Sequence, residues 1–173
     1  MKIIIVDFED SFTFNIAAVL YEYEKKIKVI PHEKFFKLNF EKNFKKKIAI
    51  ILGPGPGHPE MYEKYFNQIK LLQKMQKVYL MGICLGHQIL GLVDGFEVKN
   101  ALIPKHGEQE IIKFKNKFLK VQRYNSLAIF KDNIEVNIRI LDNGISYQFH
   151  PESIGTENGI YFFKDLLKFI DVI

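Results

Sequence analysis

The sequence contains a single cysteine, Cys84, among its 173 residues. One cysteine excludes an internal disulfide framework and is typical of proteins that work in a reducing compartment. Long apolar runs are also absent, and none approaches the roughly 20 residues that a helix needs to span a bilayer. The apolar start is too short for a signal-peptide core and is followed at once by Asp7. We therefore predict a cytoplasmic protein with no membrane partner.

Arginine is nearly as scarce as cysteine. The chain has only Arg123 and Arg139, although its formal net charge is +5. A basic protein is a candidate for nucleic-acid binding, but proteins that read bases and phosphates usually favour arginine over lysine. The lysines are spread along the chain, apart from one short cluster at residues 45–47. The composition therefore predicts no nucleic-acid partner.

The length and composition predict one globular domain. Hydrophobic residues make up 47% of the chain, which is enough to bury a proper core at this length. There are no internal repeats, low-complexity linkers or breaks in composition. We expect residues 1–173 to form a single domain.

The first half of the chain alternates between two kinds of apolar pattern. Short apolar runs predict buried strands at residues 1–6, 27–30, 48–52 and 78–82. Helical spacing predicts helices at residues 12–23, 62–75 and 85–92, with a short helix or loop within residues 32–47. This alternation predicts an α/β fold: a mostly parallel sheet with helices on both faces.

The second half has shorter apolar runs and more turn signals. We predict strands, several of them antiparallel, at residues 97–101, 110–114, 118–122, 135–141 and 145–149, and a closing helix at 161–172. The α/β fold should therefore carry a small antiparallel sheet in its second half.

Cys84 lies at a predicted turn from strand to helix, between Gly82 and Gly86. Glycines allow a tight turn and close backbone packing, as in the nucleophile elbow of serine hydrolases. The start of a helix favours the thiolate, which is the reactive form of cysteine. The alternative is a small buried core cysteine, which is the commoner fate of a lone cysteine.

A nucleophilic cysteine needs a base, and His150 is the best candidate. It follows the predicted strand 145–149, and Glu152 comes two residues later, where its carboxylate can turn back to orient the imidazole. Sites in parallel sheets lie beyond the carboxyl ends of the strands, and residues 7–10, residues 53–59 and Cys84 all follow strand ends. Taken alone, residues 150–152 could equally form a surface turn.

Four other residues bear on this site. Gln88 lies four residues after Cys84, so it can share the face of the cysteine and bind an amide or carbonyl of a substrate. His87 is interpreted as a structural residue that ties the helix to the sheet. The backbone N–H groups of Gly55 and Leu85 could together bind an oxyanion, although residues 53–59 could be a plain turn.

Three motifs carry a resemblance to a known family. Residues 82–88, preceded by residues 53–57 and followed by residues 148–153, resemble a triad-type (class I) glutamine amidotransferase domain. Residues 7–15 resemble the small subunit (component II) of anthranilate synthase and of aminodeoxychorismate (para-aminobenzoate) synthase. Further matching segments are residues 105–107 and 123–127, so the resemblance spans nearly the whole chain and implies a flavodoxin-like sheet. The departures are Gly53 in place of serine, Asn125 in place of histidine, and a short segment between His106 and His150.

The resemblance implies a catalytic triad and a glutamine pocket. Cys84 would attack the side-chain amide of L-glutamine, His150 would transfer protons, and Glu152 would orient His150. Gly55 and Leu85 correspond to the oxyanion donors. The implied glutamine-binding residues are Gly55, Pro56, Gly57, Gln88, Ser126 and Leu127.

The resemblance also implies a partner. Ammonia would pass to the large subunit (component I) of a synthase that aminates chorismate, in the folate or the tryptophan branch. It implies no cofactor or metal on this chain, with Mg²⁺ held by the partner. Two alternatives remain open: an amidotransferase for another acceptor, such as the guanylate or carbamoyl phosphate synthases, and a catalytically silent regulatory subunit.

Overall fold

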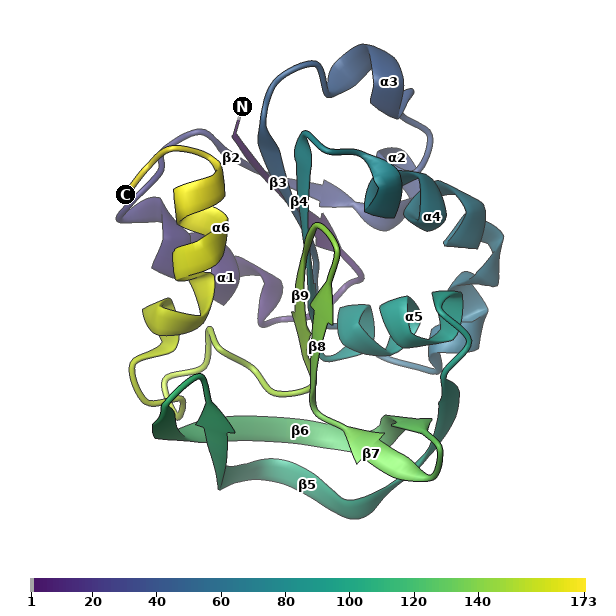
Figure 1. Cartoon of the computed structure of the whole chain (residues 1–173), viewed down its shortest axis with the longest axis vertical. Coiled ribbons are helices and arrows are strands. Elements are labelled where there is room, and N and C mark those ends of the chain that lie inside the picture. Colours follow the sequence, from purple (N-terminus) through teal and green to yellow (C-terminus); the bar gives the residue numbers. More distant parts are fainter. Residues whose placement is uncertain (1) are drawn as a thin grey trace.

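The fold contains two β-sheets. A computed structural model describes residues 2–173. Sheet A has six strands in the order β2-β1-β3-β4-β9-β8, and sheet B has three in the order β5-β6-β7. Sheet B lies across one end of sheet A (Figure 1).

Sheet A is mostly parallel, as predicted. The pairs β1–β2, β1–β3, β3–β4 and β4–β9 are parallel, and only β8–β9 is antiparallel. The strands are β1 (Ile3–Asp7), β2 (Ile27–Pro31), β3 (Ile48–Leu52), β4 (Val78–Ile83), β8 (Ile138–Leu141) and β9 (Gly144–Tyr147).

Helices cover both faces of sheet A, which confirms the predicted α/β class. On one face lie α1 (Thr13–Tyr21) and α6 (Lys164–Phe169), and on the other lie α2 (His32–Phe35), α4 (Phe66–Lys74) and α5 (Leu85–Val93) (Figure 1). The short α3 (Phe40–Asn43) follows α2. Among residues 2–173, no helix is long and apolar enough to cross a bilayer.

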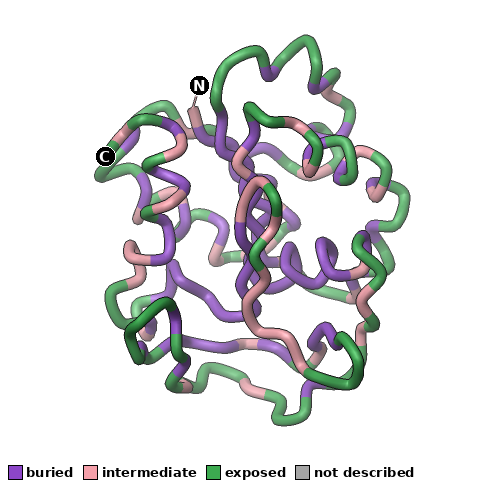
Figure 2. The backbone as a smooth tube through the Cα atoms, in the orientation of Figure 1, coloured by how far each residue is buried: buried purple, intermediate pink, exposed green. Residues whose placement is uncertain are grey.

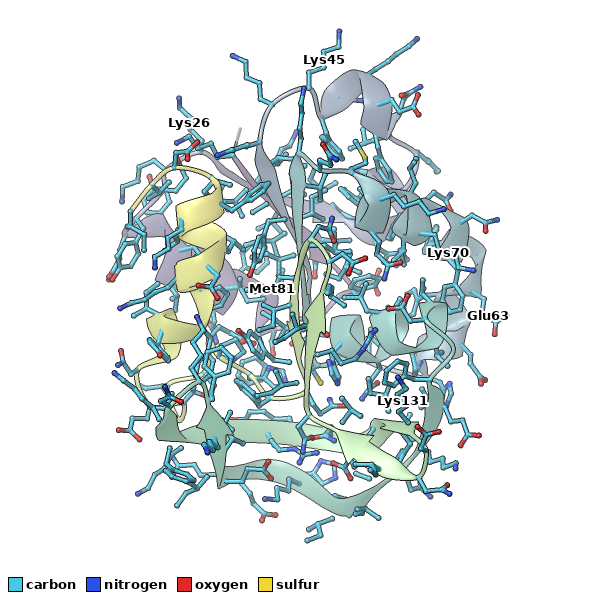
Figure 3. The ribbon with its side chains drawn as sticks, in the orientation of Figure 1. Lys26, Lys45, Glu63, Lys70, Met81 and Lys131 are labelled. Atoms are coloured by element: carbon cyan, nitrogen blue, oxygen red, sulfur yellow. The ribbon has the colours of Figure 1, made fainter. Side chains whose placement is uncertain are left out.

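Alternation along the strands divides the core between the two faces. Ile3 and Ile5 of β1 pack in the cluster that includes α1 and α6, whereas Ile4 and Val6 pack with α2, α4 and α5. Met81 of β4, labelled in Figure 3, belongs to the α1 and α6 side. The central strands are therefore buried on both faces, and Figure 2 colours their residues as buried. Each fully buried aliphatic side chain contributes about 1.5–3 kcal/mol through burial.

Sheet B is antiparallel and built from longer strands than expected. It comprises β5 (Glu97–Phe114), β6 (Lys117–Lys131) and β7 (Ile134–Val136). The predicted strands 97–101 and 110–114 are both parts of β5, whose register shifts between Asn100 and Lys105 and again between His106 and Glu108. Much of β5 is exposed to solvent (Figure 2).

The predicted strand 135–141 is wrong as a single strand. Residues 134–136 form β7 in sheet B and residues 138–141 form β8 in sheet A. The chain changes sheets at Asn137, whose carbonyl accepts a hydrogen bond from the backbone N–H of Gln148. Because β6 and β9 belong to different sheets, the segment pairs with β6 up to Val136 and with β9 from Ile138 onward.

Two predicted helices begin with tighter turns. The helix predicted at 62–75 consists of the 3₁₀ helix η1 (Pro59–Tyr65) and α4, and that predicted at 161–172 consists of η2 (Gly159–Phe163) and α6. The buried residues of η1 are Pro59, Tyr62 and Tyr65. A spacing of three aligns these side chains in one row on a 3₁₀ helix, whereas on an α-helix the row would drift around the axis, so the packing of the tyrosines suits the tighter form.

Candidate functional site

The candidate site forms where the carboxyl ends of the sheet A strands meet sheet B. Cys84 follows β4 and immediately precedes α5, and its N–H donates to the carbonyl of Tyr147 at the end of β9 (2.9 Å). The backbone of Cys84 has φ 50° and ψ −103°. A positive φ in a residue other than glycine costs on the order of 1–3 kcal/mol and is concentrated at functional sites. Cys84 thus occupies a strained turn of the nucleophile-elbow kind.

The two glycines around Cys84 are required by close packing. A Cβ on Gly86 would lie 2.1 Å from the carbonyl oxygen of Leu52 in β3. A Cβ on Gly82 would lie 2.8 Å from the backbone of Gly86. The Gly86 N–H also donates to the carbonyl of Gly53 (3.2 Å). These contacts hold the start of α5 against β3 and fix the position of Cys84.

His150 and Glu152 form a buried pair. The Nδ1 of His150 and an Oε atom of Glu152 lie 2.8 Å apart, and both side chains are almost fully buried. The backbone of His150 is joined to β6 by its N–H, which donates to the Gln122 carbonyl (2.9 Å). The structure therefore brings together the predicted base and the predicted orienting acid.

The charges around His150 favour its protonated form. Burial lowers the pKa of His150, but the negative charges of Cys84 and Glu152 outweigh it and raise the pKa well above its ordinary value. The Nε2 of His150 has no hydrogen-bond partner among the described residues.

Two aromatic rings pack against His150. The rings of Phe12 and Tyr124 each lie 5.1 Å from the imidazole, and they are 4.9 Å from each other. Phe12 immediately precedes α1 and Tyr124 belongs to β6, so the segment after β1 and sheet B both contribute to the surroundings of the histidine. These rings limit the rotation of His150 and the access of water to it.

A cavity of about 250 Å³ opens beside Cys84. It contains all six predicted glutamine-binding residues, which come from the loop after β3, from α5 and from β6. Tyr124 and Asn125 complete the lining; both stood within a matched segment but were not predicted as site residues. The lining comprises Gly55, Pro56, Gly57, Cys84, Gln88, Tyr124, Asn125, Ser126 and Leu127.

Gln88 reaches across the cavity wall to β6. Its Nε2 donates to the carbonyl of Leu127 (2.7 Å) and to the Oε1 of Gln148 (3.2 Å). Its side-chain oxygen accepts no hydrogen bond from the residues described, so it is open to a donor in the cavity. Gln88 can therefore accept from a ligand, whereas its N–H group is already used.

The predicted oxyanion donors lie next to each other. A Cβ on Gly55 would lie 2.4 Å from the Cδ2 of Leu85, so the loop after β3 closely approaches the start of α5. Leu85 is the first residue of α5, and its N–H has no acceptor within the helix. The geometry is compatible with two N–H groups converging on an oxygen beside Cys84.

An ion-pair network supports the β6 wall, and sequence reasoning missed it. Arg123 is buried and pairs with Glu110 (3.1 Å) and Glu135 (2.9 Å). Its Nε donates to the Oδ1 of Asn125 (2.9 Å), which lines the cavity. Burial raises the pKa of Glu110, but Lys105 and Arg123 outweigh this effect and lower it. The only signal in the sequence was the arginine itself, in a chain with just one other.

His87 is structural, as interpreted from the sequence. Its Nδ1 lies 2.9 Å from the hydroxyl of Ser146 in β9, and its Nε2 lies 2.8 Å from the carbonyl of Val136 in β7. The ring is fully buried. Burial, reinforced by the charges of Arg139 and Arg123, lowers the pKa of His87 to about 3. The imidazole is therefore neutral and joins α5 to both sheets.

Neutral burial of His87 predicts a loss of stability in acid. Below about pH 6.5 the unfolded chain binds a proton at this position that the folded chain excludes down to about pH 3. This group alone should lower the free energy of unfolding by about 1.4 kcal/mol per pH unit between these values. Urea titrations from pH 7 to pH 4 should therefore show a shallower decline for His87→Gln. The surface substitution His58→Gln is the matched control, and equal slopes for all three proteins would contradict the assignment.

Among residues 2–173, no group of three or more histidine, cysteine, aspartate or glutamate side chains is arranged to hold a metal ion. The absence of a cofactor from this chain stays a prediction.

The family profile described as "Glutamine amidotransferase class-I" matches residues 4–169. The chain belongs to this family. The chain is also similar to several curated proteins of about its own length. An anthranilate synthase component 2 from Leptospira biflexa is 32% identical, with 92% of this chain and 95% of the relative covered. That from Cyanophora paradoxa is 35% identical, with 91% and 93% covered.

Other relatives of this amidotransferase chain are much longer. A Schizosaccharomyces pombe protein named for aminodeoxychorismate synthase is 30% identical over 99% of this chain, which covers only 27% of that protein. The bifunctional protein TrpGD of Thermotoga maritima is 29% identical, with 33% of its length covered. The amidotransferase chain thus spans about a quarter to a third of these two relatives.

Solved structures agree on the fold. A glutamine amidotransferase from Thermotoga maritima superposes with a TM-score of 0.66 over 100% of this chain and 86% of its own, at 17% identity. A Thermoplasma acidophilum protein named for GMP synthase gives a TM-score of 0.75 over 99% and 94%, at 18% identity. At these identities the likeness concerns the fold alone.

Proposed function

We propose that this chain is the glutaminase subunit of a chorismate-aminating synthase, with Cys84 as the nucleophile and His150 and Glu152 as its catalytic partners. The observation that carries the proposal is the cavity of about 250 Å³ with Cys84 in its wall. It is smaller than the roughly 300–1,000 Å³ of sites for drug-sized ligands, which suits a single amino acid. The buried His150–Glu152 pair supplies the proton transfers that amide hydrolysis needs.

The first half of the reaction forms a thioester. The Cys84 sulfur attacks the side-chain amide carbon of glutamine, and the amide oxygen gains the negative charge. The N–H groups of Gly55 and Leu85 stabilise this oxyanion, an effect worth about 3–4 kcal/mol for one such donor. His150 then donates its proton to the nitrogen, the C–N bond breaks, and ammonia leaves a γ-glutamyl thioester on Cys84.

The second half releases glutamate. His150 removes a proton from water, which attacks the thioester carbon, and the C–S bond breaks to restore the thiolate. Glu152 accepts a hydrogen bond from the Nδ1–H of His150, which fixes the tautomer and stabilises the imidazolium. At the other end of the substrate, the open oxygen of Gln88 and the backbone of Ser126 and Leu127 would hold the α-amino and α-carboxylate groups.

The acceptor is proposed from the relatives, whose names include both anthranilate synthase and aminodeoxychorismate synthase. The test is to incubate the chain with glutamine, chorismate, Mg²⁺ and either type of large subunit, and to separate the products by chromatography. Anthranilate or aminodeoxychorismate should form with at least one partner. Glutamine hydrolysis without an aminated product from either would contradict the proposed acceptor and favour another synthase.

We further propose that the synthase subunit covers the surface beside the triad. A second cavity, of about 620 Å³, is lined by residues that include Phe12, Glu152 and Ile154. Ile154 is fully exposed, so this rim presents an apolar side chain to solvent. One oxygen of Glu152 is buried without a hydrogen-bond partner among the described residues. A partner seated here would cover the apolar rim and shield the triad from water.

Substitution of Ile154 tests this surface. Ile154→Asp should weaken the affinity for the large subunit by about tenfold or more, because it removes apolar burial and adds a charge to desolvate. The matched control is Ile140→Asp, since Ile140 is 85% exposed on the edge strand β8. Calorimetric titration with the large subunit measures both. Equal affinities for the two variants would place the interface elsewhere.

A further inference from the structure

A chain of side-chain hydrogen bonds runs from the cavity wall to the sulfur of Cys84. The carbonyl of Leu127 accepts from the Nε2 of Gln88, and the same Nε2 donates to the Oε1 of Gln148 (3.2 Å). The Nε2 of Gln148 then donates to the Sγ of Cys84 (3.7 Å). Gln148 and Gln88 are both buried, so these groups exchange little with water.

The direction of this chain is fixed at its far end. A backbone carbonyl can only accept, so the carbonyl of Leu127 requires the N–H group of Gln88 to face it. That orientation turns an N–H of Gln88 toward Gln148, which must present its oxygen in return. The amide nitrogen of Gln148 is left facing the sulfur. The Leu127 carbonyl on β6 therefore determines that Gln148 presents its N–H group, and not its oxygen, to the Cys84 sulfur.

We propose that Gln148 holds the Cys84 sulfur in position for attack and stabilises its thiolate by donating an amide hydrogen bond. Gln148 lies two residues before His150, just beyond the end of β9, so the segment that carries the base also carries a donor to the nucleophile. The sulfur thus accepts from a neutral donor on the same segment as the proposed base. The inference rests on the proposed role of Cys84 as the nucleophile.

Cys84 is the only cysteine, so alkylation by iodoacetamide reports on this one sulfur without glutamine or a partner. In Gln148→Met the donor is lost at nearly constant side-chain volume. The alkylation rate should fall about tenfold at neutral pH, since a hydrogen bond to a charged group is lost. The rate should recover at high pH, where every sulfur is ionised. A purely structural effect on access would instead lower the rate equally at all pH values.

Three controls complete the test. Gln76→Met changes an exposed glutamine and should leave the pH profile of alkylation unchanged. Gln148→Asn keeps the amide but is one methylene too short to reach the sulfur, so it should behave like Gln148→Met and serves if that variant does not fold. In the complex with the large subunit, Gln148→Met should lower kcat for glutamine with little change in KM, whereas Gln88→Met should raise KM as well as lower kcat, because Gln88 also orients the amide of Gln148.

A folded Gln148 variant with the wild-type alkylation profile would overturn the proposal. Because alkylation needs no glutaminase activity, this outcome is separate from failure of the proposed function. If alkylation of Gln148→Met is slowed as expected but the wild-type complex does not hydrolyse glutamine, the hydrogen bond from Gln148 to Cys84 is supported and the proposed glutaminase function is rejected.

Discussion

Replacement of Cys84 by serine is expected to lower glutamine-dependent synthesis about 10³-fold or more, since loss of one member of a catalytic triad has effects of this order or larger. A serine hydroxyl holds its proton far more tightly than a thiol. The charge of Cys84 is also the first cause that raises the pKa of His150, so the substitution removes the coupling as well as the nucleophile. Ammonia and glutamate release, measured in the complex with the large subunit, gives the loss.

The same complex supplies the control for this experiment. Added ammonium salt bypasses glutamine, so the Cys84→Ser complex should still form the aminated product at the wild-type rate with ammonia. Loss of both activities would indicate a misfolded subunit or a broken complex. Unchanged glutamine hydrolysis by a folded Cys84→Ser subunit would reject Cys84 as the nucleophile, whereas no glutamine hydrolysis by the wild-type complex would favour the silent regulatory role.

Replacement of Gly86 by alanine is expected to destabilise the fold by about 3 kcal/mol or more, at the upper end of overpacking effects. The new Cβ would meet the carbonyl oxygen of Leu52 at 2.1 Å. Both sides of this contact are backbone, in α5 and in β3, so no side chain can rotate away. Relief requires the start of α5 to move, which would also displace Cys84. Urea unfolding measures the stability, and glutamine hydrolysis should fall with it.

Gly95→Ala is the matched control for Gly86→Ala. Gly95 has φ +80°, but a Cβ there would meet nothing within 4 Å. This substitution should cost only the strain of a left-handed conformation, about 1–2 kcal/mol, and leave activity intact. If Gly86→Ala cost no more than Gly95→Ala, close packing of α5 on β3 would not be what fixes the elbow.

The sequence predicts the parallel half of the fold because each strand there is a short apolar run that ends at a turn. The runs 48–52 and 78–82 correspond closely to β3 and β4, since a strand buried on both faces must be apolar throughout. The change of sheet at Asn137 cannot be predicted from the pattern of apolar residues. Residues 135–141 alternate as one strand does, and the change of sheet depends on which neighbours, β6 or β9, pair with each half.

The candidate site shows the same division. Cys84, His150 and Glu152 could be proposed because the signals that point to them, the flanking glycines and the spacing of His150 and Glu152, lie within a few residues in the sequence. Gln148 and Arg123 could not, because their importance comes from partners far away in the sequence. Gln148 donates to a sulfur 64 positions away, and Arg123 pairs with Glu110 and Glu135 on two other strands. Periodicity and spacing carry no information about such contacts.

The parallel pairing of β4 with β9 has a consequence for how members of this family can differ. Cys84 follows β4 and His150 follows β9, so adjacent strands set the separation of the proposed nucleophile and base. Between Cys84 and His150 the chain leaves sheet A, forms all three strands of sheet B, and returns to sheet A as β8 and β9. Insertions and deletions in the hairpin that joins β5 and β6 can therefore accumulate while the reacting groups keep their spacing. In this architecture the hairpin can change in length while the two strands that carry the proposed nucleophile and base stay paired.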